Sequence, residues 1–268
     1  MLALSSAFAA RAEEVSAAPV SSGNAQQAAR LEGAFGLSLA YHPEYAGAER
    51  RKLGATPGLF LRYGRFTLTN ASDFATRRSD DLAAGLGVDM VRSDRLRVAL
   101  SLRLDGGRSE GSAAAFNGLG NVRSTLRLRT AASWQIEGPW RAGAAWSADL
   151  LGRGGGDTFD FSAGWDRKIT EQTTLTVGSQ LGLGSRRYMQ TYFGISADQA
   201  SRSAYPVYQP QAGLREGSLF IKLRRDIARE WIMVGSASVS RLLGPAAASP
   251  ITRTPNGWAL NAGLARQF

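Results

Sequence analysis

Residues 96–105 read LRVALSLRLD, and their side chains alternate between two chemical classes. Leucine or valine occupies every even position, whereas arginine, alanine, serine and aspartate occupy the odd ones. Because successive side chains of a β-strand point to opposite faces, this period of two predicts a strand with one apolar and one polar face. A soluble sandwich would show the same period, so the choice between the two depends on the rest of the chain.

The alternation recurs at 126–134, 173–183 and 219–224. The whole pattern predicts strands near 33–41, 56–63, 65–70, 82–91, 95–105, 122–135, 140–151, 158–169, 173–184, 217–226, 231–241 and 258–268. Short turns alternate with long loops at 42–55, 71–81, 106–121, 152–157, 185–216 and 242–257. Short periplasmic turns and long extracellular loops are typical of outer-membrane barrels. We therefore predict an all-β fold, a transmembrane antiparallel up-and-down barrel of about 12 strands in the outer membrane.

Aromatic residues gather at the expected strand ends. Next to the short turns lie Tyr63, Phe66, Trp134, Trp140, Trp231 and Phe268, and near the long loops lie Tyr41, Phe159 and Trp258. Two such girdles are expected at the headgroup levels of a membrane barrel. The last strand alternates and ends on Phe268, which resembles the signal that the barrel assembly machinery reads, so this machinery is an expected partner.

Composition and the N-terminal residues further limit the class of protein and its compartment. None of the 268 residues lies in an apolar run near the roughly 20 residues that a membrane-spanning helix needs. Cysteine is absent, which suits an oxidising compartment. Residues 1–12 resemble the back part of a secretory signal peptide without its basic start, and a disordered Ala/Ser-rich tail is the alternative. We expect residues 13–32 to form a periplasmic linker and 33–268 to form the barrel.

The net charge of +10 would suggest nucleic-acid binding in a soluble protein. Here many arginines fall on the polar strand face, so we place them in the lumen and expect no nucleic-acid partner. The predicted lumen charge network consists of Arg97, Arg103, Arg127, Arg129, Asp105, Asp149 and Asp160. It either fills a narrow lumen or lines an anion-preferring passage, and we favour the filled or very narrow state. Cations on the long loops, such as Arg50, either bind lipopolysaccharide phosphates or are simply solvated.

Patterns for catalysis are missing from the sequence. His42 is the single histidine, so neither a catalytic triad nor a cluster of metal ligands can be assigned. No glycine-rich phosphate loop leads from a strand into a helix. We therefore expect no enzyme activity, no cofactor and no metal.

The loop at 185–216 is the longest, and a connection of this length is usually functional or disordered. It contains too many aromatic residues for a disordered tether. We expect it to fold back over the outer mouth as a lid and a candidate ligand site, formed by Arg186, Arg187, Tyr188, Tyr192, Phe193, Tyr205 and Tyr208. The alternative, which we favour slightly, is that the rings only anchor the lid.

Several motifs carry a family resemblance. They read YHPEYAG at 41–47, GLGNV at 118–122, RYMQTYFGIS at 187–196, SRLLG at 240–244 and SPI at 249–251. In this order they resemble the MipA/OmpV family. Departures occur at Ala48, Arg187 and Pro245, where the family often carries acidic residues, so this chain lacks acids on which a loop site of the family would depend.

The resemblance implies a Gram-negative outer-membrane scaffold that links a lytic murein transglycosylase to a penicillin-binding protein, and thus hydrolysis of peptidoglycan to its synthesis. Short periplasmic turns leave such partners little surface, since a standard interface buries about 800 Å² per partner. The alternative is a small-solute pore, or a surface receptor or adhesin that acts through the long extracellular loops.

Overall fold

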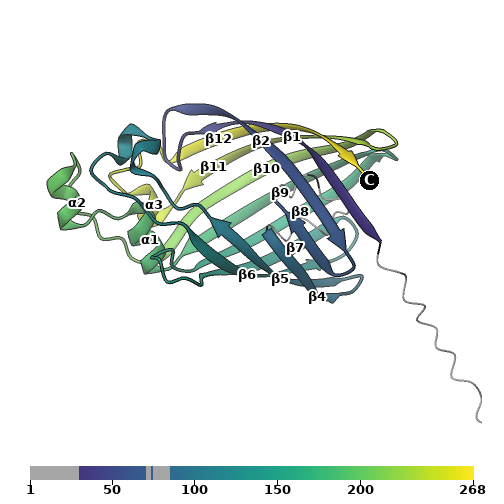
Figure 1. Ribbon diagram of the computed structural model, residues 1–268, viewed down its shortest axis with the longest axis horizontal. Helices are drawn as coiled ribbons and strands as arrows, with labels where there is room; N and C mark the ends of the chain where they lie inside the picture. The colour runs from purple at the N-terminus through teal and green to yellow at the C-terminus, as the bar shows by residue number, and fades with distance from the viewer. Residues whose placement is uncertain (1–29, 71–73, 75–84) are drawn as a thin grey trace, which may run out of the picture.

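The computed structural model describes residues 30–70, 74 and 85–268 (Figure 1). Within these ranges the strands close into one antiparallel barrel, in which each strand pairs with its neighbours in sequence and β1 pairs with β12. They are β1 (Leu31–Pro43), β2 (Arg51–Tyr63), β3 (Phe66–Thr69), β4 (Gly85–Arg92), β5 (Leu96–Asp105), β6 (Thr125–Gln135), β7 (Trp140–Asp149), β8 (Thr158–Thr170), β9 (Thr173–Gly184), β10 (Gly213–Ala228), β11 (Trp231–Leu242) and β12 (Asn256–Gln267). The pairing of β1 with β12 closes the ring of strands, and a closed barrel is the β-structure that hydrocarbon tolerates. The predicted fold class is confirmed.

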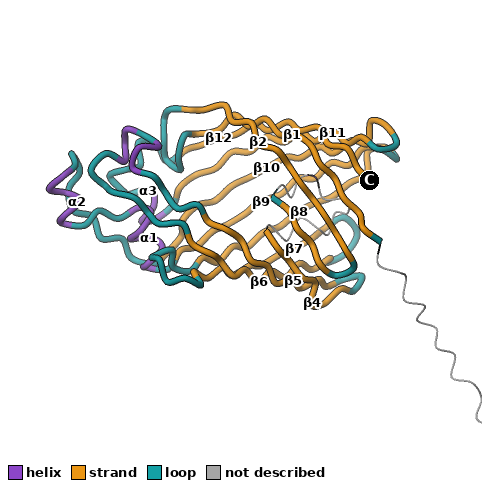
Figure 2. Tube along the Cα trace, in the orientation of Figure 1, coloured by secondary structure: helices purple, strands orange, loops and turns teal. Residues whose placement is uncertain are grey.

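The two ends of the barrel differ. The helices are α1 (Arg186–Phe193), α2 (Ala197–Arg202) and α3 (Gly244–Ala247), with 3₁₀ turns η3 (Glu110–Ser112) and η4 (Ala114–Phe116). Figure 2 shows the helices at one end and a wall made of strands. The C-terminus lies at the other end, where Gly33 and Phe268 exchange two backbone hydrogen bonds of 3.0 Å. The helical end carries the long loops and is therefore extracellular. Among the described residues, no helix is long and apolar enough to cross a membrane.

The wall separates its two faces as the alternation predicts. In β5, Arg97, Ala99 and Ser101 are buried, whereas Leu104 is 74% exposed on the other face. The aromatic residues of both predicted girdles are exposed, namely Tyr63, Phe66, Trp134, Trp140, Trp231, Phe268, Tyr41, Phe159 and Trp258. So much exposed apolar surface suits a bilayer, whereas in water it would favour aggregation.

Several strands extend beyond the predicted bounds, mainly at the extracellular end. β10 begins at Gly213 instead of residue 217, and β12 begins at Asn256 instead of residue 258. Backbone pairing continues beyond the apolar belt, where side chains no longer alternate between polar and apolar. The sequence pattern therefore predicts strands that are too short. The register of β10 against β9 also shifts between Leu214 and Glu216, which marks a β-bulge. Apart from Phe74, the loop predicted at 71–81 lies outside the described residues.

An apolar cluster fills part of the lumen near the periplasmic end. It consists of Phe74 together with Ala34, Phe60, Ile232, Val234 and Ala265, from the inner faces of β1, β2, β11 and β12. A Cβ atom on Gly263 would lie 2.9 Å from the Phe74 ring, so this glycine leaves the space that the ring occupies. Phe74 thus follows β3 in sequence but packs against four other strands.

The extracellular loops pack on one another and form a folded cap. Its first cluster contains Ala113, Phe116, Leu119, Ile195 and Ile251, and its second contains Met189, Phe193, Leu242 and Ala246. Apart from Leu242, the last residue of β11, these residues come from the β5–β6, β9–β10 and β11–β12 connections. The cap therefore has an apolar core of its own, shared by segments that are far apart in sequence.

Candidate functional site

The candidate site lies where α1 meets the outer mouth of the lumen. Ser185 begins this helix, since its side-chain oxygen accepts a hydrogen bond from the Tyr188 backbone N–H at 3.3 Å. Two glycines let Tyr188 approach the wall closely. A Cβ on Gly184 would lie 2.7 Å from its ring, and a Cβ on Gly156 would lie 2.3 Å from its backbone nitrogen. Gly156 also has a φ of +57°, which glycine adopts at little cost.

Arg127 joins three segments at this mouth. Its Nε donates to Oδ2 of Asp105 at 2.7 Å, while Nη1 and Nη2 donate to the carbonyls of Gly156 (3.0 Å) and Gly155 (2.6 Å). One guanidinium therefore connects β5, β6 and the β7–β8 loop. Because Arg127 is buried, loss of its carboxylate partner would leave a buried charge without compensation.

Tyr192 of α1 completes this group. Its hydroxyl donates to the same Asp105 oxygen at 3.2 Å, and its carbonyl accepts a hydrogen bond from Arg108 at 3.3 Å. Burial and then the charge of Asp105 raise the pKa of Tyr192 to about 12. The phenol therefore stays protonated and remains a donor at neutral pH. Burial lowers the pKa of Arg108, whose guanidinium lies 4.7 Å from the centre of the Phe116 ring.

A second group forms around Asp160 of β8. Arg129 donates to its Oδ2 at 3.2 Å and Arg215 donates to its Oδ1 at 3.0 Å, so one carboxylate holds arginines from β6 and β10. The β-bulge of β10 directs the Arg215 side chain into the lumen. Arg215 also donates to the Tyr188 hydroxyl at 3.5 Å, and the Tyr188 and Tyr192 rings lie 4.7 Å apart. The two tyrosines thus connect both charged groups.

Further ion pairs lie toward the periplasmic end. Asp89 is 4% exposed and lies 2.6 Å from Arg97 and 3.4 Å from Arg62. A cavity of about 180 Å³ that Arg129 and Arg141 help to line remains inside the barrel. The interior is therefore crossed by paired charges at several levels of the wall.

Two residues of the predicted charge network lie on the inner strand face next to Arg127 but form no ion pair among the described residues. Arg103 is exposed. Asp149 accepts hydrogen bonds from Thr125, Leu151 and Gly155. The β7–β8 loop turns through positive-φ glycines, and its backbone N–H groups need acceptors, which this carboxylate supplies.

The predicted lid residues divide into two sets. Tyr188 and Tyr192 reach the lumen charges, whereas Phe193 is buried in the cap. Tyr205 accepts a hydrogen bond from Arg253 at 3.2 Å, and Tyr208 donates to the carbonyl of Pro245 at 2.8 Å, so both lie within the cap. Arg186 and Arg187 are exposed, and Arg187 donates to the carbonyl of Gly152 at 3.3 Å.

Sequence reasoning missed Arg108, Arg215 and Phe74. Both arginines fall in segments predicted as loops, where no alternation shows which way a side chain points. The one available signal for Phe74 is an aromatic residue within a polar stretch. Among the described residues, no group of three or more His, Cys, Asp or Glu side chains could hold a metal ion.

The closed barrel and the loop motifs that form its cap agree with the family that the sequence matches. Residues 35–268 match the family described as MltA-interacting protein MipA. The chain belongs to the MipA family. It is a MipA-family β-barrel of the outer membrane, and the resemblance drawn from the loop motifs is confirmed. No protein of the curated set matches this MipA-family chain.

Solved structures are similar to this MipA-family barrel. An outer membrane channel from Pseudomonas putida F1 has a TM-score of 0.46 at 10% identity, covering 90% of this chain and 96% of that one. The outer membrane channel DcaP of Acinetobacter baumannii has a TM-score of 0.41 at 7% identity, covering 90% of this chain and 97% of that one. At such identities the likeness concerns the fold alone.

Proposed function

We propose that this MipA-family barrel is a non-enzymatic scaffold that holds murein-hydrolysing and murein-synthesising enzymes at the outer membrane. The observation that carries the proposal is the family description, MltA-interacting protein, which applies to residues 35–268. A lytic murein transglycosylase and a penicillin-binding protein are the partners that this membership suggests.

The side chains that occupy the lumen favour a scaffold function and argue against an open pore. Tyr192, Asp105 and Arg127 occupy the outer mouth, the group around Asp160 follows, and Phe74 fills part of the periplasmic end. A diffusion pore needs a continuous aqueous passage, which paired side chains at successive levels oppose.

The periplasmic rim supplies a basic contact surface. Its exposed cations include Arg65, Arg92, Arg95, Arg167, Lys168, Arg225 and Arg229, against the exposed acids Asp94, Glu137, Glu171, Asp226 and Glu230. An acidic surface on a partner enzyme would be complementary to this rim and would be attracted to it over about a Debye length. Because the turns are short, we also assign a share of the contact to the predicted linker.

A pull-down tests the scaffold. The full barrel in mild detergent is immobilised and incubated with an envelope extract that contains both enzyme classes. We expect the barrel to retain them, and we expect Arg95→Glu combined with Arg229→Glu to retain several-fold less. Arg123→Glu, at the extracellular end, is the matched control. Failure of the wild-type barrel to retain either enzyme class would refute the scaffold.

A second candidate function is a surface receptor. A cleft of about 660 Å³ in the cap is lined by Glu44, Tyr45, Glu49, Arg50, Arg202, Tyr205 and Arg253, among others. Charges of both signs beside aromatic rings suit a small polar solute. Saturable binding of such a solute that is lost in Arg253→Ala would support this function, and large steady currents in planar bilayers would instead indicate a pore.

A further inference from the structure

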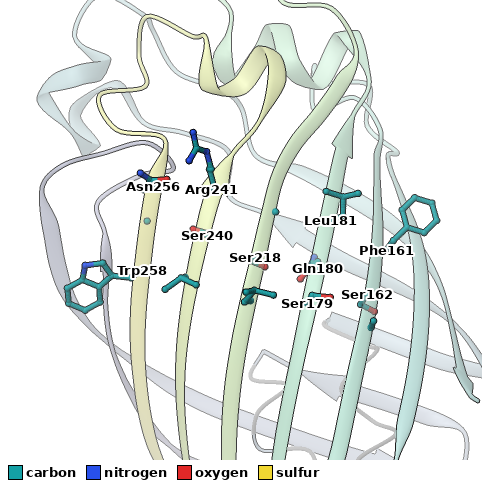
Figure 3. A pocket seen from close by; sticks show the side chains of 15 residues that line it. Phe161, Ser162, Ser179, Gln180, Leu181, Ser218, Ser240, Arg241, Asn256 and Trp258 are labelled. Carbon is teal, nitrogen blue, oxygen red and sulfur yellow. The ribbon is translucent and has the colours of Figure 1, made fainter. Parts of the chain in front are cut away.

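The outer wall carries a groove of about 900 Å³ across β8 to β12, just below the extracellular loops (Figure 3). Two cross-strand rows of outward residues line it. The row nearer the loops is Phe161, Leu181, Gly217, Arg241 and Asn256, and the next row is Ala163, Ser179, Leu219, Val239 and Trp258.

Small residues make this part of the wall concave. Gly217 lies between Leu181 and Arg241 in the first row, and Ala163 pairs with Ser179 in the second. The larger side chains of Phe161, Leu219 and Trp258 are 51%, 61% and 41% exposed, so they project from the wall beside these small residues. The hollow is therefore built into the strands and does not depend on a loop.

The groove combines an apolar floor with cations at its outer end. Among the described residues that line the groove, Arg241 is the one charged residue. Its side chain is exposed and forms no ion pair with another described residue. A second cation, Arg51, lies 3.6 Å from the centre of the Trp258 ring and donates to the Trp258 carbonyl at 2.6 Å. An occupant must therefore offer apolar surface along the wall and negative charge beside the loops.

We propose that the groove binds one phosphorylated lipid of the outer leaflet, lipid A in chemical class, with acyl chains on Leu181, Leu219 and Val239 and a phosphate on Arg241 and Arg51. The wall faces hydrocarbon, and a guanidinium forms charge-assisted, bidentate hydrogen bonds with phosphate. The volume falls within the usual range for ligand pockets.

A second copy of the barrel is a poorer occupant. Two identical walls packed together would bury both Arg241 side chains in an apolar contact that contains no acid from either groove. Burial of a charge without a partner is strongly unfavourable. A lipid phosphate, in contrast, supplies the missing charge at the depth where headgroups lie.

Native mass spectrometry of the full barrel in mild detergent tests the proposal. We expect one lipid A per barrel, and roughly tenfold weaker binding of the same lipid without its phosphates, as loss of charge-assisted hydrogen bonds implies. Arg241→Gln should weaken binding of lipid A by a similar factor. Gly217→Leu should also weaken it by filling the groove, since a Cβ there has an ordinary contact of 3.5 Å with Leu243.

Matched controls lie elsewhere on the barrel. Arg123→Gln changes another exposed arginine of the extracellular end, and Gly235→Leu adds the same bulk at a position whose Cβ would meet only the Asn261 carbonyl, at 3.9 Å. Both should bind like wild type. Equal binding of the two lipid forms by the wild-type barrel overturns the proposal whether or not the variants assemble. A barrel dimer that Gly217→Leu dissociates overturns it as well.

Discussion

The hydroxyl of Tyr192 donates a hydrogen bond of 3.2 Å to Oδ2 of Asp105, which lies 87 positions earlier in the chain. The same oxygen accepts a hydrogen bond from Arg127 at 2.7 Å. One carboxylate thus connects a helix of the cap to the charges of the lumen. We infer that the docking of α1 on the barrel depends on this atom.

Tyr192→Phe should loosen the cap. The variant loses one hydrogen bond to a charged acceptor in a half-exposed position, so we expect α1 docking to weaken by about 1 kcal/mol. That corresponds to roughly fivefold faster cleavage of the β9–β10 loop by an added protease. Tyr205→Phe is the control, because its hydroxyl bonds to an exposed arginine within the cap. Identical cleavage rates for wild type and Tyr192→Phe would contradict the role of this hydrogen bond.

The same contact should depend on pH. The pKa of Tyr192 is raised from 10.0 to about 12, so its contribution to stability is complete below pH 10 and is lost as the pH rises through about 12. Protease susceptibility of the cap should therefore increase over this alkaline window. Burial also raises the pKa of Tyr188, so the phenolate absorbance gained near pH 12 should decrease in Tyr192→Phe by the share of one tyrosine and should not vanish. Identical titration curves for wild type and Tyr192→Phe would show that Tyr192 does not have a raised pKa.

Phe74→Ala should destabilise the barrel strongly. The ring is fully buried among apolar side chains of four strands, and its removal leaves a cavity that costs roughly 3–5 kcal/mol. Urea unfolding in detergent measures the loss. Phe159→Ala is the control, because Phe159 is 46% exposed on the outer wall. A loss for Phe74→Ala no larger than for Phe159→Ala would show that Phe74 does not pack in the lumen.

Leu128→Arg tests the sidedness of β6. Leu128 pairs with Leu102 and Ala148 on the outer face, three residues inside the extracellular end of β6, so an arginine there should cost more than at the interface, up to about 2–4 kcal/mol. Leu104→Arg, one residue before the extracellular end of β5, should cost about 0–1 kcal/mol. Unfolding in lipid vesicles compares the two variants. Equal costs would place the midplane elsewhere along the strands.

The order of amino acids was sufficient to predict the barrel. Alternation such as that of residues 96–105 is a local property, because each strand residue points to one face whatever its partners are. Loop lengths then distinguished the two ends, and aromatic positions marked the two girdles. The inward direction of Arg97 and Arg127 followed from the same period, and both are buried in the structure.

Tertiary structure alone decided which of these residues meet. Arg127 meets Asp105 because β5 and β6 are neighbours in a particular register, and Arg215 reaches Asp160 only because a bulge turns it inward. The Asp149 carboxylate accepts a hydrogen bond from the Gly155 backbone N–H, and this contact depends on the positive φ angles of neighbouring glycines. The groove at Gly217 arises from residues on five strands. Such contacts depend on register, bulges and loop packing, which a two-residue period does not contain.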